Sequence, residues 1–222
     1  MLALISVFVG AIAGLIGAAF RLSLVQADAW RNVLITWAQQ HAALGALLVI
    51  VVCSAATTMA AFMVQRLSPQ ATGSGIPQVA AVLDGRMAQP AWHVIWVRFI
   101  GGLLAIGSGL ALGREGPTVH MGASIAHSLG RLLGRNDRDC RVLLAAGAGA
   151  GLATAFNAPI AGAVFVLEEL ARKFDTRITI ATFGASLGAI AVSRFLLGQG
   201  PDFQVEPFPY AGLGQVWPYL GL

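Results

Sequence analysis

Charge is the scarcest feature of this sequence. Only 11% of its 222 residues are charged and 57% are hydrophobic, whereas soluble domains carry roughly 25% charged residues. With a mean hydropathy of +0.75, the composition excludes an ordinary soluble domain and a disordered chain. We therefore expect membrane-spanning helices. At about 20 residues each, the length allows at most about eight of them, with no soluble domain.

Cysteines and metal-ligand clusters are also scarce. Cys53 and Cys140 are the two cysteines and lie far apart, which excludes a disulfide framework and a paired-cysteine redox site. His120 and His127 share a helix face by spacing, but without a third ligand they indicate packing or hydrogen bonding. We expect no metal and no cofactor. The 14 Lys and Arg residues are scattered between apolar runs, so nucleic acid is not an expected partner.

Long uncharged runs predict the helices. Residues 2–20 and 42–64 are uncharged and long enough to span a bilayer, and residues 178–193 predict a last helix. Between the first two runs, Trp30 and Trp37 indicate a headgroup layer. The last 22 or so residues, from Gly200 on, are rich in proline and aromatic residues, which predicts a loop at the membrane interface.

Other apolar segments are interrupted. Residues 91–113 and 116–133 meet at a charged pair, so two helices are predicted to abut there. Residues 142–167 contain Asn157-Ala158-Pro159, and proline disfavours a continuous helix, which predicts a broken pair.

Glycines four residues apart place small residues on one helix face, where two helix backbones can approach closely. Such pairs are Gly10/Gly14, Gly109/Gly113, Gly130/Gly134, Gly147/Gly151 and Gly184/Gly188. Each pair is a weak signal alone because the chain has 27 glycines. Together they predict tight helix packing.

The first candidate site is a turn that opens a short helix, with the sequence Gly73-Ser74-Gly75-Ile76-Pro77 (the 73–77 motif). A serine that can cap a helix precedes a proline suited to the first turn, and the first N–H groups of a helix have no partner within it. These N–H groups, with the helix dipole and the serine hydroxyl, can hold an anion such as chloride. Spacing alone leaves a simple surface turn open as the alternative.

The second candidate site repeats this design with a carboxylate at the helix start, in the sequence Gly113-Arg114-Glu115-Gly116-Pro117 (the 113–117 motif). Ionised Glu115 would compete with an anion for the helix end, and protonated Glu115 would leave it, so one residue could couple proton arrival to anion entry. An interfacial turn with a solvated ion pair is the equal alternative.

The third candidate is the acidic pair Glu168-Glu169, which follows an apolar helix. Adjacent helical residues point about 100° apart, so only one can face a given cavity and relay protons. Arg172 and Lys173 stand four residues later, and surface ion pairs at that spacing are the stronger alternative.

Taken together, these blocks resemble the CLC family of chloride channels and chloride/proton exchangers. The resemblance rests on the two motifs, with Thr118 after the second, and on residues 147–170 with Ala155-Phe156-Asn157-Ala158-Pro159 and the acidic pair. It implies an all-α, polytopic membrane fold of tilted and broken helices, built as two inverted halves and assembled as a homodimer. Residues 1–222 resemble the N-terminal half, without the second half's G-x-F-x-P segment and inner tyrosine.

The resemblance also implies roles for single residues. Ser74 would give its hydroxyl to a central chloride site, and Glu115 would be the gating glutamate. Glu169 would be the internal proton-transfer glutamate, with Glu168 aiding proton access. An acid at 169 favours exchange over conduction, and serine at 74 favours chloride over nitrate. Arg98 stands where a lysine is common in the family.

The expected function is therefore chloride/proton antiport in a bacterial inner membrane. An uncoupled voltage- or pH-gated chloride channel is the main alternative, and a non-transporting membrane subunit is a further one. We do not expect an enzyme. An intramembrane hydrolase with Ser74 as nucleophile is disfavoured, because the histidines lack a nearby carboxylate and the serine lacks nucleophile-elbow spacing.

Overall fold

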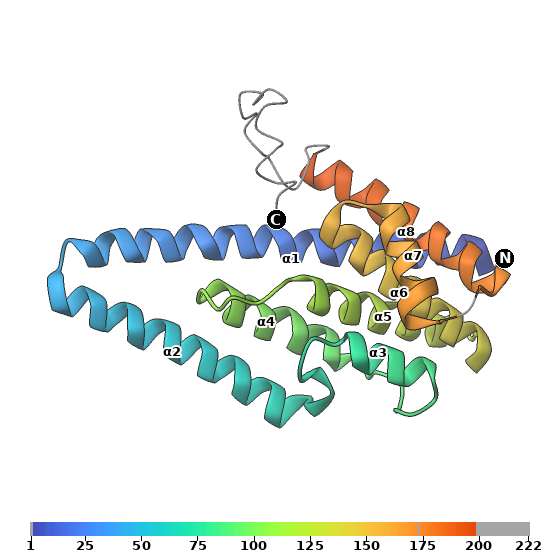
Figure 1. The fold of residues 1–222 in the computed structure, drawn as a ribbon, viewed down its shortest axis with the longest axis horizontal. Coiled ribbons are helices and arrows are strands. Elements are labelled where there is room, and N and C mark those ends of the chain that lie inside the picture. Colours follow the sequence, from blue (N-terminus) through green and yellow to red (C-terminus); the bar gives the residue numbers. More distant parts are fainter. Residues whose placement is uncertain (1, 173, 199–222) are drawn as a thin grey trace, which may run out of the picture.

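The computed structural model describes residues 2–172 and 174–198, and all regular structure in these residues is helical (Figure 1). This confirms the predicted all-α class. The expected interfacial loop after residue 200 lies outside the described residues. The elements are α1 (Leu2–Gln39), α2 (Ala42–Leu67), η1 (Pro69–Ala71), α3 (Ile76–Leu83), α4 (His93–Gly107), α5 (Glu115–Leu132), α6 (Asp137–Phe156), α7 (Pro159–Phe165), η2 (Val166–Leu170) and α8 (Thr176–Leu197).

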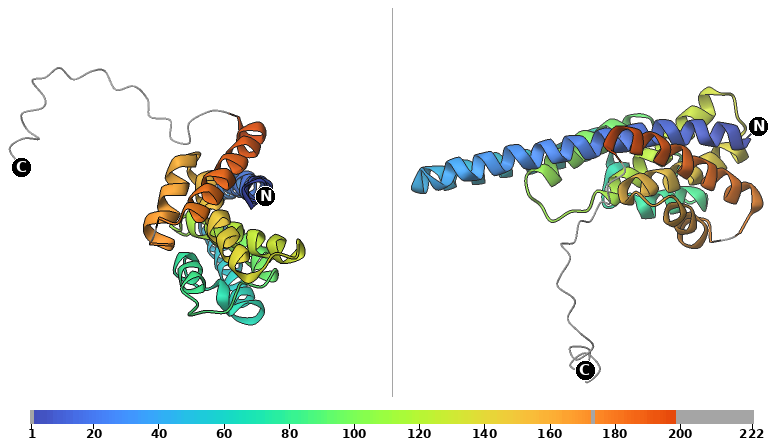
Figure 2. Two further views of the ribbon diagram at one scale, coloured as in Figure 1. Left: turned by 90° about the vertical axis from the view of Figure 1, so that its right-hand side faces the viewer. Right: turned by 90° about the horizontal axis from the view of Figure 1, so that it is seen from above.

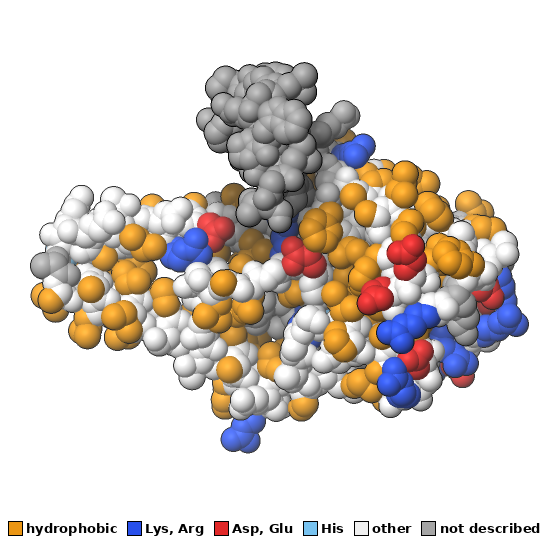
Figure 3. Space-filling model, in the orientation of Figure 1, with side chains coloured by type: hydrophobic (Ala, Val, Ile, Leu, Met, Phe, Trp, Pro, Cys, Tyr) orange, Lys and Arg blue, Asp and Glu red, His pale blue; other side chains and the backbone are white. Residues whose placement is uncertain are grey.

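Four of the described helices are long and apolar enough to cross a membrane, namely α1, α2, α6 and α8. The end of the α1–α2 hairpin that carries its turn extends beyond the remaining helices (Figure 1), and Figure 3 shows hydrophobic side chains exposed along it. Charged side chains of both signs gather at the opposite end of the molecule, at the right of that view. An apolar surface beside a charged end is what a bilayer requires of an embedded protein.

Helix α1 is much longer than the sequence indicates. It continues through Trp30 and Trp37 to Gln39, where a headgroup layer was expected. Residues 21–39 contain no glycine and no proline, so nothing in them ends a helix. The aromatic residues therefore lie on a continuous helix.

Helix α6 lies at the centre of the fold, packed between α5 and α8. Of its most apolar 18-residue stretch, 89% is buried inside the protein. A Cβ atom added at Gly122 of α5 would overlap the Gly147 carbonyl oxygen of α6. One added at Gly151 would overlap the Thr118 carbonyl oxygen. The predicted close approach at the 147/151 pair is confirmed.

The glycines of α1 and α8 also meet backbone to backbone. A Cβ atom at Gly10 would overlap the Ala185 backbone, and one at Gly188 would overlap the Val7 carbonyl oxygen. Figure 2 shows the first half of α1 lying along α8.

The prediction of close helix packing is wrong for the 109/113 and 130/134 glycine pairs. Gly109 and Gly113 lie outside helices, and Gly134 lies in the turn after α5, with φ +65°.

The predicted break in the 142–167 segment is confirmed. Helix α6 ends at Asn157, which adopts the left-handed conformation at φ 53°, and α7 begins at Pro159.

The predicted contact of two helices at Arg114-Glu115 is wrong, because residues 108–114 separate α4 from α5 without helical structure. Gly109, at φ +96°, turns the chain out of α4.

Candidate functional site

The 73–77 motif forms the loop that leads into α3. Gly75 is the N-cap residue, at φ +93°, and the expected capping by Ser74 is wrong. The Ser74 side chain is exposed at the loop. The first backbone bond of this helix is donated by Val79 N–H to the Gly75 carbonyl oxygen. The amides before Val79 therefore have no partner within the helix, and Pro77 has no amide hydrogen.

A buried arginine forms hydrogen bonds to the backbone of this loop. Arg98 of α4 donates from Nη1 to the Gly73 carbonyl oxygen at 2.7 Å and from Nη2 to the Thr72 carbonyl oxygen at 3.2 Å. Its Nε donates to His120 Nδ1 of α5 at 3.1 Å. A Cβ atom on Gly75 would lie 2.9 Å from Arg98 Nη2 and 2.8 Å from His120 Cβ. Space and backbone conformation thus both require glycine at 75.

The 113–117 motif forms the start of α5. Arg114 is the N-cap residue and Glu115 the first helical residue. The Thr118 hydroxyl donates to the carbonyl oxygens of Arg114 and Glu115, which stabilises the first turn. A Cβ atom on Gly113 would overlap Glu115 Oε2. The Glu115 carboxylate is therefore folded back against the Gly113 backbone, at the helix end.

The two motifs meet directly. A Cβ atom on Gly116 would overlap the Ser74 carbonyl oxygen, so the start of α5 lies against the loop that opens α3. Two helix N-termini are brought together, each with amides that have no partner within the helix and with a partial positive charge. The Ser74 backbone thus lies against Gly116, the residue that follows Glu115. Such an arrangement can hold a small anion without contact from a cationic side chain.

The acidic pair lies elsewhere in the fold. Glu168 and Glu169 are exposed on η2, a single π-helical turn that continues α7. Arg172 donates to the Glu169 backbone carbonyl oxygen at 3.3 Å. The structure thus does not bring the acidic pair into the group formed by the two motifs.

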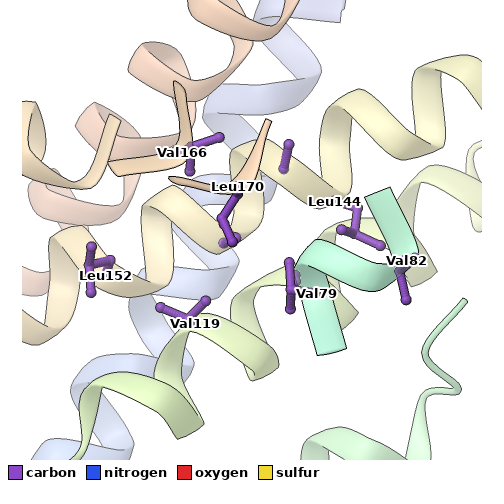
Figure 4. Packing of buried hydrophobic residues seen from close by; sticks show 10 residues of the cluster. Val79, Val82, Val119, Leu144, Leu152, Val166 and Leu170 are labelled. Atoms are coloured by element: carbon purple, nitrogen blue, oxygen red, sulfur yellow. The ribbon is translucent and has the colours of Figure 1, made fainter. Parts of the chain in front are cut away.

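One hydrophobic cluster links the acidic turn to both motif helices. It contains residues from α3, α5, α6 and η2, labelled in Figure 4 as Val79, Val82, Val119, Leu144, Leu152, Val166 and Leu170. Because these side chains are buried against one another, the four elements are held in one fixed arrangement. Glu115 and Glu169 therefore extend from a shared core.

The arginine–histidine pair is the part of the site that the sequence motifs miss. His120 and His127 form hydrogen bonds as expected, with Arg98 and with Gln89 Oε1 respectively. No cluster of metal ligands occurs among the described residues. The available signal for the pair was an arginine inside an apolar helix, since intramembrane charges commonly have a functional or structural partner.

Comparison with known proteins agrees with this geometry. The family model described as "Voltage gated chloride channel" matches residues 56–222. The H(+)/Cl(−) exchange transporter ClcA of Citrobacter koseri is 34% identical over 96% of this chain and 46% of its own length. That of Vibrio vulnificus is 36% identical over 97% of this chain and 47% of its own length. The chain spans about half the length of the curated relatives it matches.

Solved structures show the same fold. A slow cyanobacterial Cl−/H+ antiporter superimposes with a TM-score of 0.87 at 30% identity, over 99% of this chain and 52% of that one. A eukaryotic CLC transporter, at 24% identity and a TM-score of 0.78 over 99% of this chain and 40% of that one, shares the fold. The family model matches most of the chain, the relatives and solved structures agree with it, and four helices are suited to crossing a membrane. The chain therefore belongs to the voltage gated chloride channel (CLC) family of multi-pass membrane proteins.

Proposed function

We propose that this chain forms the N-terminal half of a chloride/proton antiporter of the bacterial inner membrane. One observation carries the proposal: Gly116 lies against the Ser74 carbonyl, which brings the N-termini of α3 and α5 to one place. Chloride would be held there by backbone N–H groups and the Ser74 hydroxyl. Partial charges bind an anion more weakly than a full cation does, which permits release.

Glu115 would act as the gate of this site. Its carboxylate already lies against the Gly113 backbone at the start of α5, where an anion would also be attracted. Carboxylate and chloride would exclude each other, and protonation would release the carboxylate from the helix end. Proton binding and chloride entry would thereby be coupled through one side chain.

Glu169 would exchange protons with the opposite side of the membrane, with Glu168 beside it. Its exposure on η2 suits exchange with water, and the common core keeps η2 fixed relative to α5. The remaining half of the pathway would come from the part of the fold that the longer relatives possess. We also expect two copies to associate as a homodimer through membrane-embedded faces. No cofactor is needed.

The test is paired chloride and proton flux in liposomes that contain the full-length natural protein. The wild type should use a proton gradient to drive chloride uphill. Glu115→Gln should lose proton coupling, because a neutral amide no longer titrates. Glu169→Gln should abolish proton movement while chloride still moves. Glu168→Gln is the matched control, with the same charge change on the same turn, and should retain coupled transport.

Two results would contradict the proposal. Chloride that only equilibrates down its gradient in the wild type would indicate an uncoupled channel. Unchanged proton coupling in both Glu115→Gln and Glu169→Gln would remove these residues from the mechanism.

A further inference from the structure

A pocket that the transport mechanism does not use lies where four elements end or begin. Its volume is about 460 Å³, and it is bounded by the end of α3, the start of α6, the end of η2 and the start of α8. Charged residues dominate its polar lining, which consists of Asp84, Arg138, Arg141, Asp175 and Arg177.

The carboxylates of this region are all engaged. Asp84 forms an ion pair with Arg86. Asp175 accepts from the backbone N–H groups of Arg177 at 2.8 Å and Ile178 at 3.3 Å, which caps α8. Asp139, beside the pocket, pairs with the Arg177 guanidinium at 2.9 Å. Each negative charge is therefore already balanced by a cation or a helix N-terminus.

Two guanidinium groups remain without an acidic partner among the described residues. Arg138 and Arg141 are both exposed and both line the pocket. They stand three residues apart in the first two turns of α6, so their side chains lie on one face. The partial positive charge at the start of α6 adds to theirs. The pocket thus holds unbalanced positive charge in a concave space.

We propose that this pocket binds a phosphate group. Guanidinium groups present planar pairs of N–H donors that match phosphate oxygens, and they do so better than point-like ammonium groups. The volume accommodates a phosphate with its attached group, carried either by a lipid headgroup or by a soluble phosphate compound. Leu170 and Ala171 at the end of η2 also line the pocket, so the ligand would contact the turn that carries the acidic pair.

Binding to purified full-length protein in a neutral detergent tests the proposal without any transport assay. Sodium pyrophosphate, titrated at constant ionic strength, is the soluble probe, and phosphatidylglycerol retained in native mass spectrometry is the lipid probe. R138Q/R141Q should bind at least one probe roughly tenfold or more weakly than the wild type, because charged hydrogen bonds are lost. R66Q/R131Q is the control, since it removes the same charge at exposed positions outside the pocket.

A second variant separates the effect of the planar guanidinium donors from the effect of positive charge. R138K/R141K keeps both positive charges and should bind with intermediate affinity. Weakening of pyrophosphate binding assigns a soluble phosphate, and weakening of phosphatidylglycerol binding alone assigns a lipid headgroup. The proposal is overturned if the wild type binds neither probe, or if R138Q/R141Q and R66Q/R131Q bind both probes equally well.

Discussion

At the scale of single residues, the contact between Gly116 and Ser74 determines the geometry of the proposed anion site. Any side chain at 116 would overlap a backbone carbonyl, and a backbone atom cannot rotate away as a side chain can. Gly116→Ala must therefore separate α5 from the 73–77 loop. We expect chloride flux into liposomes to fall roughly tenfold or more, because misplaced binding groups lose most of their effect.

The control for this prediction is Gly85→Ala. Gly85 adopts φ +73° with no atom near its missing Cβ, so alanine there introduces backbone strain of about 1–2 kcal/mol without a collision. Flux should remain within about twofold of the wild type. If Gly116→Ala transports as well as Gly85→Ala, close contact of the two motifs is not required.

The sequence predicted part of this geometry at residue resolution. Glu115 is at a helix start, as the flanking glycines and Pro117 indicated. This was predictable because the residues that favour a helix start lie next to it in the sequence. The bond between Arg98 and His120 could not be predicted in the same way. These residues are 22 positions apart, on different helices, and their contact depends on how α4 packs against α5.

At the scale of elements, α1 and α8 are held together by glycines on both helices. We predict that Gly188→Ile destabilises the protein by about 1–3 kcal/mol or more, because its side chain would collide with the Val7 backbone. The measurement is the midpoint of thermal unfolding in detergent. Leu187→Ile, one position away and 59% exposed, should stay within about 0.5 kcal/mol of the wild type. Equal midpoints for the two variants would contradict this account of the interface.

Elements whose ends carry strong local signals were predictable. Pro159 and the left-handed Asn157 end α6 and begin α7 where the sequence indicated. The length of α1 was not predictable from hydrophobicity, since its second half carries charges and tryptophans that are typical of an interface. The π-helical turn at Val166–Leu170 has no local sequence signal that we recognise. Val166 and Leu170, at the two ends of this turn, are both buried in the shared core.

At the scale of the whole molecule, the structure brings together two basic stretches whose relative placement the sequence leaves open. The basic stretches at 131–141 and 172–177 could have been on opposite sides of the membrane. Arg177 pairs with Asp139, and Arg138, Arg141 and Arg177 line one pocket, so both stretches are at the same face. Cytoplasmic loops carry the excess of Lys and Arg, and we predict that this face is cytoplasmic.

Thiol labelling of intact cells tests the orientation. Leu133→Cys lies in the exposed turn after α5, at the basic face, and Gln40→Cys lies in the turn between α1 and α2, at the far end (Figure 1). A membrane-impermeant maleimide should label Gln40→Cys from outside and leave Leu133→Cys unlabelled until the membrane is opened. The reverse pattern would show that the basic face is extracellular.

The enclosure of α6 has a consequence for how the protein enters the membrane. The most apolar 18-residue stretch of α6 has a mean hydropathy of 1.2, against 2.4 for α1 and α2 and 1.7 for α8. Helix α6 is nevertheless the most buried of these four helices. A translocon, which sorts segments by their affinity for lipid, would retain α6 only weakly on its own. Its integration should therefore depend on α5 and α8 closing around it. Helix assembly would then precede, rather than follow, stable insertion of the central span.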